Sequence, residues 1–268
     1  MKLAIIGAGN MASALAGGIL ENGVLPAIDM TMTDLDKEKL SSFAQRGVNT
    51  MTSNVDAAKS ADVVLLAVKP NIYPIVLKEL AALEEKPCDK EKRIYVTIAP
   101  GITIRQVKEM LGYDAKVIRT MPNTPAMVGE GMTALCYEAP VSGTEYKNVE
   151  KLFRAVGRVQ LLDEKLLNSV IGISGSSPAY VYMMIEAMAD AGVRDGLPRT
   201  VAYQMAAQSV LGTAKMVLET GRHPAELKDM VCSPGGTTIE AVRVLEEKGF
   251  RSSLIEAMIA CNKRAEKK

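Results

Sequence analysis

The sequence is poor in the side chains that several classes of protein require. It has no tryptophan and one histidine, and aromatic residues make up only 4% of its 268 residues. So few aromatic side chains argue against a surface on which nucleic-acid bases stack. The 32 basic and 31 acidic residues nearly balance, so no excess positive charge favours nucleic acid or an anionic membrane. A single histidine also argues against a His/Cys metal site, and we expect no bound metal.

Cysteines and long apolar runs are also scarce. The four cysteines, Cys88, Cys136, Cys232 and Cys261, lie far apart and form no C-x-x-C pair. This spacing is typical of free thiols in a reducing compartment. The first apolar run ends at Gly7, which makes it too short for a signal peptide or a membrane span. We therefore expect a soluble, cytoplasmic protein without a membrane partner.

The N-terminus carries a nucleotide-binding motif. A short apolar strand, Lys2 to Ile6, is followed by a glycine turn and by a helix of small residues that ends at Glu21. Strand, turn and helix are the context in which G-x-G-x-x-G/A binds a dinucleotide, although an ordinary turn in a parallel sheet has the same outline. The residues that fit the motif are Gly7, Ala8, Gly9, Asn10, Met11 and Ala12.

The next strand bears on the choice of cofactor. It is predicted over about Asp29 to Thr33, and Asp34 follows about 20 positions after the motif, where the adenosine ribose is read. An aspartate there bonds the 2′-hydroxyl and repels a 2′-phosphate, which slightly favours NADH over NADPH. Two lysines, Lys37 and Lys39, could instead accept a phosphate, and Asp34 could simply cap the helix that begins near Leu35.

Strands and helices continue to alternate through the first half of the chain, which predicts a doubly wound parallel sheet. We expect this Rossmann-type dinucleotide-binding domain to span residues 1–162. Ligands bind at the carboxyl ends of such strands. Later turns at Val68–Pro70, Ala99–Gly101 and Pro122–Thr124 therefore fall on the same edge as the glycine motif, unless they only reverse the chain.

Residues 163–268 contain no strand-like run and predict an all-helical domain. Two long segments, Tyr180 to Ala191 and Ala202 to Leu218, are apolar on more than one face. About a hundred helical residues cannot bury that much surface alone. We expect these helices to form a homodimer, the alternative being that they pack only against the N-terminal domain.

Two small, hydroxyl-rich stretches stand at helix starts in this second domain. In Ser233 to Thr238, the helix begins either at Pro234 with Ser233 as its cap, or after the glycines at Thr237 or Thr238. Free backbone N–H groups at such a start suit an anion, although a tight loop between two helices has the same composition. Ser174 to Tyr180 repeats this chemistry, and the two could close together on a small carboxylate.

Acid–base machinery is missing from the sequence. His223 precedes Pro224 and is best interpreted as the residue that begins a helix. No Ser–His–Asp set and no carboxylate pair stand out, so chemistry that needs a side chain titrating near neutrality is poorly served. Hydride transfer to a cationic C=N bond needs only position and anion binding, because the cofactor supplies the reactive group.

Taken with these motifs, the chain resembles the pyrroline-5-carboxylate reductase family. The glycine motif, Val68 to Pro70, Met121 to Pro125 and Ile173 to Tyr180 are similar to segments of that family. Leu227 to Ile239 is similar to the family signature almost residue for residue, and the likeness runs from residue 1 to about 260.

The resemblance implies reduction of 1-pyrroline-5-carboxylate to L-proline by NAD(P)H. It implies that Thr238 lies near the ring nitrogen and hydrogen-bonds it or relays its proton. It also implies a dimer through interleaved C-terminal helices, which can assemble further into a decamer. Implied substrate contacts are Ser174, Ser176, Ser177, Pro178, Ser233, Gly235, Gly236 and Thr237. The expected cofactor contacts, besides the glycine motif, are Thr33, Asp34, Asn54, Ala67, Val68, Lys69, Pro70, Ala99, Pro100 and Asn123.

Asp34 departs from that pattern, because family members that favour NADPH carry Ser, Thr or Arg there. Two other interpretations stay open. One is a non-catalytic dinucleotide sensor, which would not need the second hydroxyl-rich helix start. The other is a different imine or β-hydroxyacid reductase. The β-hydroxyacid enzymes use a lysine on the long central helix, and Pro178 to Gly192 contains none.

Overall fold

The computed structural model describes residues 1–83 and 93–266, and Cys88 lies outside these ranges. The described residues form two compact units. The first unit comprises Met1–Ser176 together with the residues from Cys261 on. The second unit is Ser177–Ala260. The domain boundary predicted at 162/163 thus falls before the point at which the units separate.

An eight-stranded sheet forms the centre of the first unit, in the order β3-β2-β1-β4-β5-β6-β7-β8. The expectation of a doubly wound sheet is confirmed, with one difference. β6 and β7 pair antiparallel, because the turn that joins them is too short for a crossover helix, while the other neighbours pair parallel. The strands are β1 (Leu3–Ile6), β2 (Met30–Thr33), β3 (Asn49–Met51), β4 (Val63–Leu66), β5 (Ile94–Thr97), β6 (Lys116–Met121), β7 (Gly131–Tyr137) and β8 (Gly157–Leu161).

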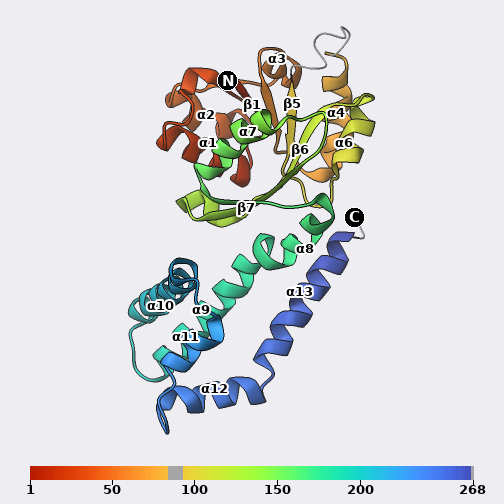
Figure 1. Cartoon of the computed structure of the whole chain (residues 1–268). Helices are drawn as coiled ribbons and strands as arrows, with labels where there is room; N and C mark the ends of the chain where they lie inside the picture. The colour runs from red at the N-terminus through yellow and green to blue at the C-terminus, as the bar shows by residue number, and fades with distance from the viewer. Residues whose placement is uncertain (84–92, 267–268) are drawn as a thin grey trace. The chain divides into compact units, whose positions relative to one another are not determined.

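Helices cover both faces of this sheet (Figure 1). One apolar cluster packs α1 (Asn10–Glu21), α2 (Lys37–Gln45) and α7 (Gly143–Arg154) against the first face. A second cluster packs α3 (Asn54–Lys59), α4 (Tyr73–Ala81) and α6 (Ile104–Leu111) against the other. The central strands β1 and β4 are therefore buried on both sides, as their continuous apolar sequences predict.

After β8 the first unit continues as a helical segment. It consists of a 3₁₀ turn (Glu164–Leu166), the short helix α8 (Leu167–Val170) and a π-helical turn (Ile171–Gly175). Ser174 and Gly175 are therefore helical, and only Ser176 separates this turn from α9, where the sequence suggests an open loop before a helix. The last turns of α13 (Phe250–Glu266), from Cys261 on, also belong to this unit.

The second unit is entirely helical among its described residues. Its longest helices, α9 (Ser177–Arg194) and α10 (Arg199–Thr220), pack against each other at Gly192, where an added Cβ would lie 3.5 Å from the Cβ of Ala202 in α10. The remaining helices are α11 (Pro224–Met230), α12 (Thr237–Glu247) and the body of α13. None of the helices in the described ranges is long and apolar enough to cross a membrane.

Candidate cofactor and substrate sites

Gly7 ties the glycine motif to the strands beside it. Its backbone N–H donates to the carbonyl of Thr33 at 2.8 Å, and its φ of +103° is one that other residues avoid. A Cβ at this position would lie 3.0 Å from the carbonyl oxygen of Ala67. The turn after β1 is therefore held against the ends of β2 and β4 and needs glycine there.

Gly9 has a different environment, which fits a bound phosphate. A Cβ placed on Gly9 would meet no protein atom within 4 Å, so the backbone there faces open space. Gly9 is also the N-cap of α1 and makes no side-chain cap bond, which leaves the N–H groups of the first turn available to a ligand. Asn10 and Met11 begin the helix, while Ala12 is buried against the core, as close helix–strand packing requires. This geometry fits a dinucleotide pyrophosphate.

Asp34 lies directly after β2 and binds two backbone amides. One carboxylate oxygen accepts the N–H of Ala8 at 2.8 Å, and the other accepts the N–H of Asp36 at 2.9 Å. Burial alone raises the pKa of Asp34, but these hydrogen bonds outweigh it and hold the pKa below its ordinary value. The side chain is half-buried, and an ionised carboxylate has further lone pairs to accept a ribose hydroxyl.

The alternative that Asp34 caps the following helix is wrong. α2 begins at Lys37 with Asp36 as its N-cap, whose side chain accepts the N–H of Glu38. Lys39 forms an ion pair with Asp36 at 3.5 Å, so one of the two lysines that could accept a phosphate already has a partner. Asp34 therefore does not cap α2, and its carboxylate binds the N–H groups of Ala8 and Asp36.

Thr33 and Asn54 form a second polar contact at the end of β2. The hydroxyl of Thr33 donates to Oδ1 of Asn54 at 2.8 Å, and Nδ2 of Asn54 donates to Glu79 at 3.2 Å. Thr33 is fully buried, whereas Asn54 opens α3. Two residues expected near the adenosine ribose are therefore neighbours, and their contact with a cofactor stays a prediction.

A cavity of about 330 Å³ lies at the carboxyl edge of the sheet, and we call it the edge pocket. It gathers residues from β-strand ends that are far apart in the sequence. Eight of its residues are among the predicted contacts: Met11, Ala67, Val68, Lys69, Pro70, Ala99, Pro100 and Ser176. The others, not predicted individually, are Ile98, Met121, Pro122, Ile171 and Gly175. The sequence could have indicated Ile98, Met121 and Pro122, since they lie within or next to the turns that it assigns to this edge.

Buried hydroxyl groups fix two turns of the edge pocket. The Tyr73 hydroxyl donates to the carbonyl of Leu66 at 2.8 Å and lies 2.8 Å from the Thr97 hydroxyl. Oγ1 of Thr97 in turn accepts the N–H of Ala99 at 3.3 Å. Burial raises the pKa of Tyr73, so its hydroxyl keeps the proton that it donates to Leu66. The ends of β4 and β5 are thereby held in register.

Asn123 supports the pocket from behind and does not line it. Its Nδ2 donates to the carbonyl of Ser174 at 3.0 Å, and its Oδ1 accepts the N–H of Met132 at 2.8 Å. The side chain is buried and joins the end of β6 to the π-turn. Its predicted contact with the cofactor stays a prediction, while its observed partners are protein groups.

The hydroxyl-rich stretch in the second unit is a turn that leads into α12. The helix starts at Thr237 with Gly236 as its N-cap and no side-chain cap bond, so the later of the two predicted starts is correct. Gly235 has a φ of +66°, and a Cβ on Gly236 would lie 2.4 Å from Oγ of Ser233. Both glycines are therefore required for the turn, and the first N–H groups of α12 are free of side-chain caps.

The other predicted substrate residues fall in both units. Ser174 and Ser176 belong to the first unit, whereas Ser177 and Pro178 open α9 in the second. Oγ of Ser174 donates to the carbonyl of Val170 at 3.3 Å. The meeting of these serines with the α12 turn stays a prediction.

His223 begins α11, as predicted. It is the N-cap, and its Nδ1 accepts the backbone N–H of Ala225 at 3.2 Å. Among residues 1–83 and 93–266, no group of three or more His, Cys, Asp or Glu side chains is placed to hold a metal ion. The thiols of Cys136, Cys232 and Cys261 are free.

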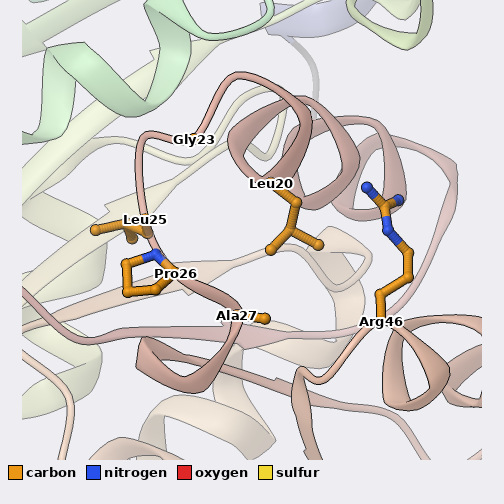
Figure 2. Close-up of a pocket in the computed structure, with 6 residues that line it drawn as sticks. All are labelled: Leu20, Gly23, Leu25, Pro26, Ala27 and Arg46. Carbon is orange, nitrogen blue, oxygen red and sulfur yellow. The ribbon is translucent and has the colours of Figure 1, made fainter.

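A second hollow, of about 570 Å³, lies at the other edge of the sheet, before β2 begins (Figure 2). Its one charged side chain, Arg46, forms an ion pair with Glu21 at 3.4 Å. None of the predicted site residues lines it, so the candidate site is the edge pocket. Its lining residues are Leu20, Gly23, Leu25, Pro26, Ala27 and Arg46.

Comparison with known proteins identifies the family of the chain. Residues 164–268 match the family model described as pyrroline-5-carboxylate reductase dimerisation, and residues 2–98 match NADP oxidoreductase coenzyme F420-dependent. A pyrroline-5-carboxylate reductase of Escherichia coli is 49% identical over 99% of this chain and 97% of its own. One from Pisum sativum is 38% identical over 98% of this chain and 94% of its own.

Solved structures agree with these sequence matches. The pyrroline-5-carboxylate reductase of Coxiella burnetii superposes with a TM-score of 0.90 at 35% identity, covering 99% of this chain and 97% of that one. The Plasmodium falciparum pyrroline carboxylate reductase, solved with NADP bound, gives a TM-score of 0.89 at 32% identity with the same coverage.

Proposed function

The chain belongs to the pyrroline-5-carboxylate reductase family. From that membership we propose which of its residues bind the cofactor and the substrate when 1-pyrroline-5-carboxylate is reduced to L-proline. The protein is an NAD(P)-dependent oxidoreductase, and its substrate is a small molecule. In this reaction a hydride adds to the carbon of the C=N bond, and the ring nitrogen keeps or gains a proton. The dihydronicotinamide supplies the hydride when the cofactor is bound.

The edge pocket is the observation that carries the proposal. It places Met11 of α1 and the turns after β4, β5 and β6 around one cavity, together with Ile171, Gly175 and Ser176. We assign the nicotinamide ring to this pocket and the pyrophosphate to the N-terminus of α1 at Gly9. Thr33, Asp34 and Asn54 then serve the adenosine ribose, since they follow β2 and open α3 beside the glycine motif.

A preference for NADH is part of the proposal. A 2′-phosphate would approach the ionised carboxylate of Asp34, whose pKa is held low by two amides, and like charges repel. Lys39 does little to offset this repulsion of a 2′-phosphate, because it already pairs with Asp36. The Plasmodium falciparum relative was solved with NADP bound, so we attribute the proposed preference to Asp34 and do not extend it to the family.

On the substrate side, an anion site at the α12 turn fits the carboxylate of the substrate. We propose that Ser233, Gly235, Gly236 and Thr237 hold it, since uncapped N–H groups at a helix start bind anions. Thr238 then stands one residue further along α12, where its hydroxyl would hydrogen-bond the ring nitrogen. Ser174, Ser176, Ser177 and Pro178 would shape the space for the ring.

In this scheme, positioning of the cofactor and the substrate replaces acid–base catalysis by side chains. The single histidine, His223, caps α11 through its Nδ1 and so has a structural partner. A protonated imine already carries the positive charge that attracts hydride, so binding and orientation suffice for a large part of the rate. α9 contains no lysine to act as a general acid, which disfavours a β-hydroxyacid reductase.

The chain forms a homo-oligomer, as its dimerisation family model indicates. We propose that the dimer forms through the C-terminal helices and can assemble further into a decamer. In the single chain, several large apolar side chains of α9 and α10 are more than half exposed, and a partner's helices would bury them. They include Tyr182, Met183, Met205, Leu211 and Leu218. The free thiols fit a cytoplasmic location.

One assay tests the proposed reaction and its cofactor together. Oxidation of NADH and of NADPH is followed at a fixed concentration of 1-pyrroline-5-carboxylate, with proline measured as the product. We expect turnover with both cofactors and a higher kcat/KM with NADH. A folded oligomer that turns over neither cofactor would contradict the reductase function and favour a dinucleotide sensor. A higher kcat/KM with NADPH would contradict only the assigned preference.

A further inference from the structure

A single π-helical turn separates α8 from α9. It covers Ile171 to Gly175, and the N–H of Ser176 donates to the carbonyl of Ile171, five residues back, at 2.8 Å. Such a turn accommodates one more residue than an α-helical turn, and in proteins it occurs mostly as a single bulge, frequently at functional sites. We refer to Ile171–Gly175 as the π-turn.

The π-turn forms one wall of the edge pocket. Ile171, Gly175 and the following Ser176 line the cavity opposite the turns after β4 and β5. If the π-turn relaxed to an α-helix, every later residue would rotate by about 100° relative to the residues before it. Gly175 and Ser176 would then leave the cavity. The pocket therefore depends on the extra residue in this turn.

Side chains from elsewhere in the fold hold the π-turn by its backbone. Oδ1 of Asn262, in α13, accepts the N–H of Gly172 at 2.9 Å, although the two residues lie 90 positions apart. From the other side, Asn123 donates to the carbonyl of Ser174. Next to Asn262, the thiol of Cys261 donates to Oγ of Ser176 at 3.2 Å. The π-turn is thus held in place by Asn123, which follows β6, and by residues of α13.

We propose that Asn262 is a positioning residue for hydride transfer. Its side chain binds the N–H of Gly172, which is neither a predicted cofactor contact nor a predicted substrate contact. By accepting the N–H of Gly172 it stabilises the π-turn, and the π-turn presents Gly175 and Ser176 to the reacting ring. The inference rests on the proposed placement of the nicotinamide in the edge pocket.

The test compares Asn262→Ala with Asn262→Asp in the full-length oligomer. Alanine removes the acceptor, yet it is the best helix former and the position is only half-buried, so folding is preserved. Aspartate keeps an oxygen that can accept the Gly172 N–H. Lys263→Ala, at an exposed neighbouring position of α13, is the matched control.

Three measurements separate positioning from a merely structural role. Asn262→Ala should lower kcat on the order of 10-fold, as small misplacements of reacting atoms do, with little change in the KM for the cofactor. The isotope effect on kcat with NADH deuterated at the transferred position should rise, because hydride transfer becomes slower than product release. Hydrogen exchange of peptides covering residues 167–176 should accelerate. Asn262→Asp should recover most of the loss, and Lys263→Ala should match the wild type.

Unchanged kcat and isotope effect in folded Asn262→Ala would overturn the proposal. Equal impairment of the alanine and aspartate variants would overturn it too, because the acceptor would then not be the cause. The pocket assignment is tested separately with Val68→Trp, which places a bulky ring at a half-buried lining position. Normal cofactor affinity in that variant would contradict the proposed nicotinamide site itself, whatever the result at Asn262.

Discussion

The carboxylate of Asp34 accepts the backbone N–H of Ala8 at 2.8 Å and so joins the end of β2 to the glycine motif. The same side chain is the one that would meet the 2′-position of the adenosine ribose. Asp34 holds the turn, and we predict that it also influences the choice of cofactor.

Replacing Asp34 by serine should shift the cofactor preference. Removing the negative charge ends its repulsion of a 2′-phosphate, so the ratio of kcat/KM for NADPH to that for NADH should rise about 10-fold or more. The KM for both cofactors should also rise, because the turn loses its bond to Ala8. Glu130→Gln is the control, since it removes an exposed carboxylate outside the glycine motif and α2 and leaves the Lys39–Asp36 pair intact. An unchanged ratio in Asp34→Ser would mean that Asp34 points away from the ribose.

Asp34 also makes stability depend on pH. Its pKa in the folded protein lies below the ordinary value of 3.8, so its stabilising contribution is complete above that value. The contribution is lost as the pH falls through the lower pKa of the folded state. The free energy of unfolding of Asp34→Asn should thus lie below that of the wild type near neutral pH. The difference should fade as the pH falls below 3.8 and through the lower pKa of the folded state.

Urea denaturation across this pH range measures the effect. Glu130→Gln changes an exposed carboxylate before β7 and serves as the control. A difference between wild type and Asp34→Asn that persists unchanged into acid would show that the charge of Asp34 does not contribute.

The two glycines of the motif should respond in opposite ways to alanine. Gly7→Ala places a Cβ 3.0 Å from the Ala67 carbonyl at a positive φ, and it should destabilise the fold by about 1–3 kcal/mol. Gly9→Ala meets no protein atom and should keep its thermal stability. Its methyl group would instead occupy the space assigned to the pyrophosphate, so the Kd for NADH should rise about 10-fold or more. Thermal unfolding and NADH fluorescence titration distinguish the two, and tight binding by Gly9→Ala would place the pyrophosphate elsewhere.

Thr238 is the residue on which the substrate proposal can be tested most directly. Thr238→Ala should lower kcat on the order of 10-fold or more, because a hydrogen bond that positions the ring nitrogen is lost. Thr238→Ser keeps the hydroxyl and should retain most of the activity. Steady-state kinetics with saturating cofactor measures both variants. If Thr238→Ala has the kcat of the wild type, the hydroxyl has no part in the mechanism.

Much of this protein follows from its sequence alone. The strand, glycine turn and helix at the N-terminus, the alternation that builds the sheet and the helical second half depend on local spacing and composition. So does the cap at His223, since side-chain reach within a few residues decides it. The sequence left two starts open for α12, and the structure has the later one, at Thr237. The edge of the sheet where the pocket lies follows from the same alternation.

Only the tertiary structure decided the rest. The Asp34–Ala8 bond and the support of the π-turn by Asn123 and Asn262 each join groups far apart in the chain. The local sequence of Ile171 to Ser176 is compatible with a loop, an α-helix or a π-turn. Which of them forms depends on partners supplied by β6 and α13, and those partners meet the turn only after the chain has folded.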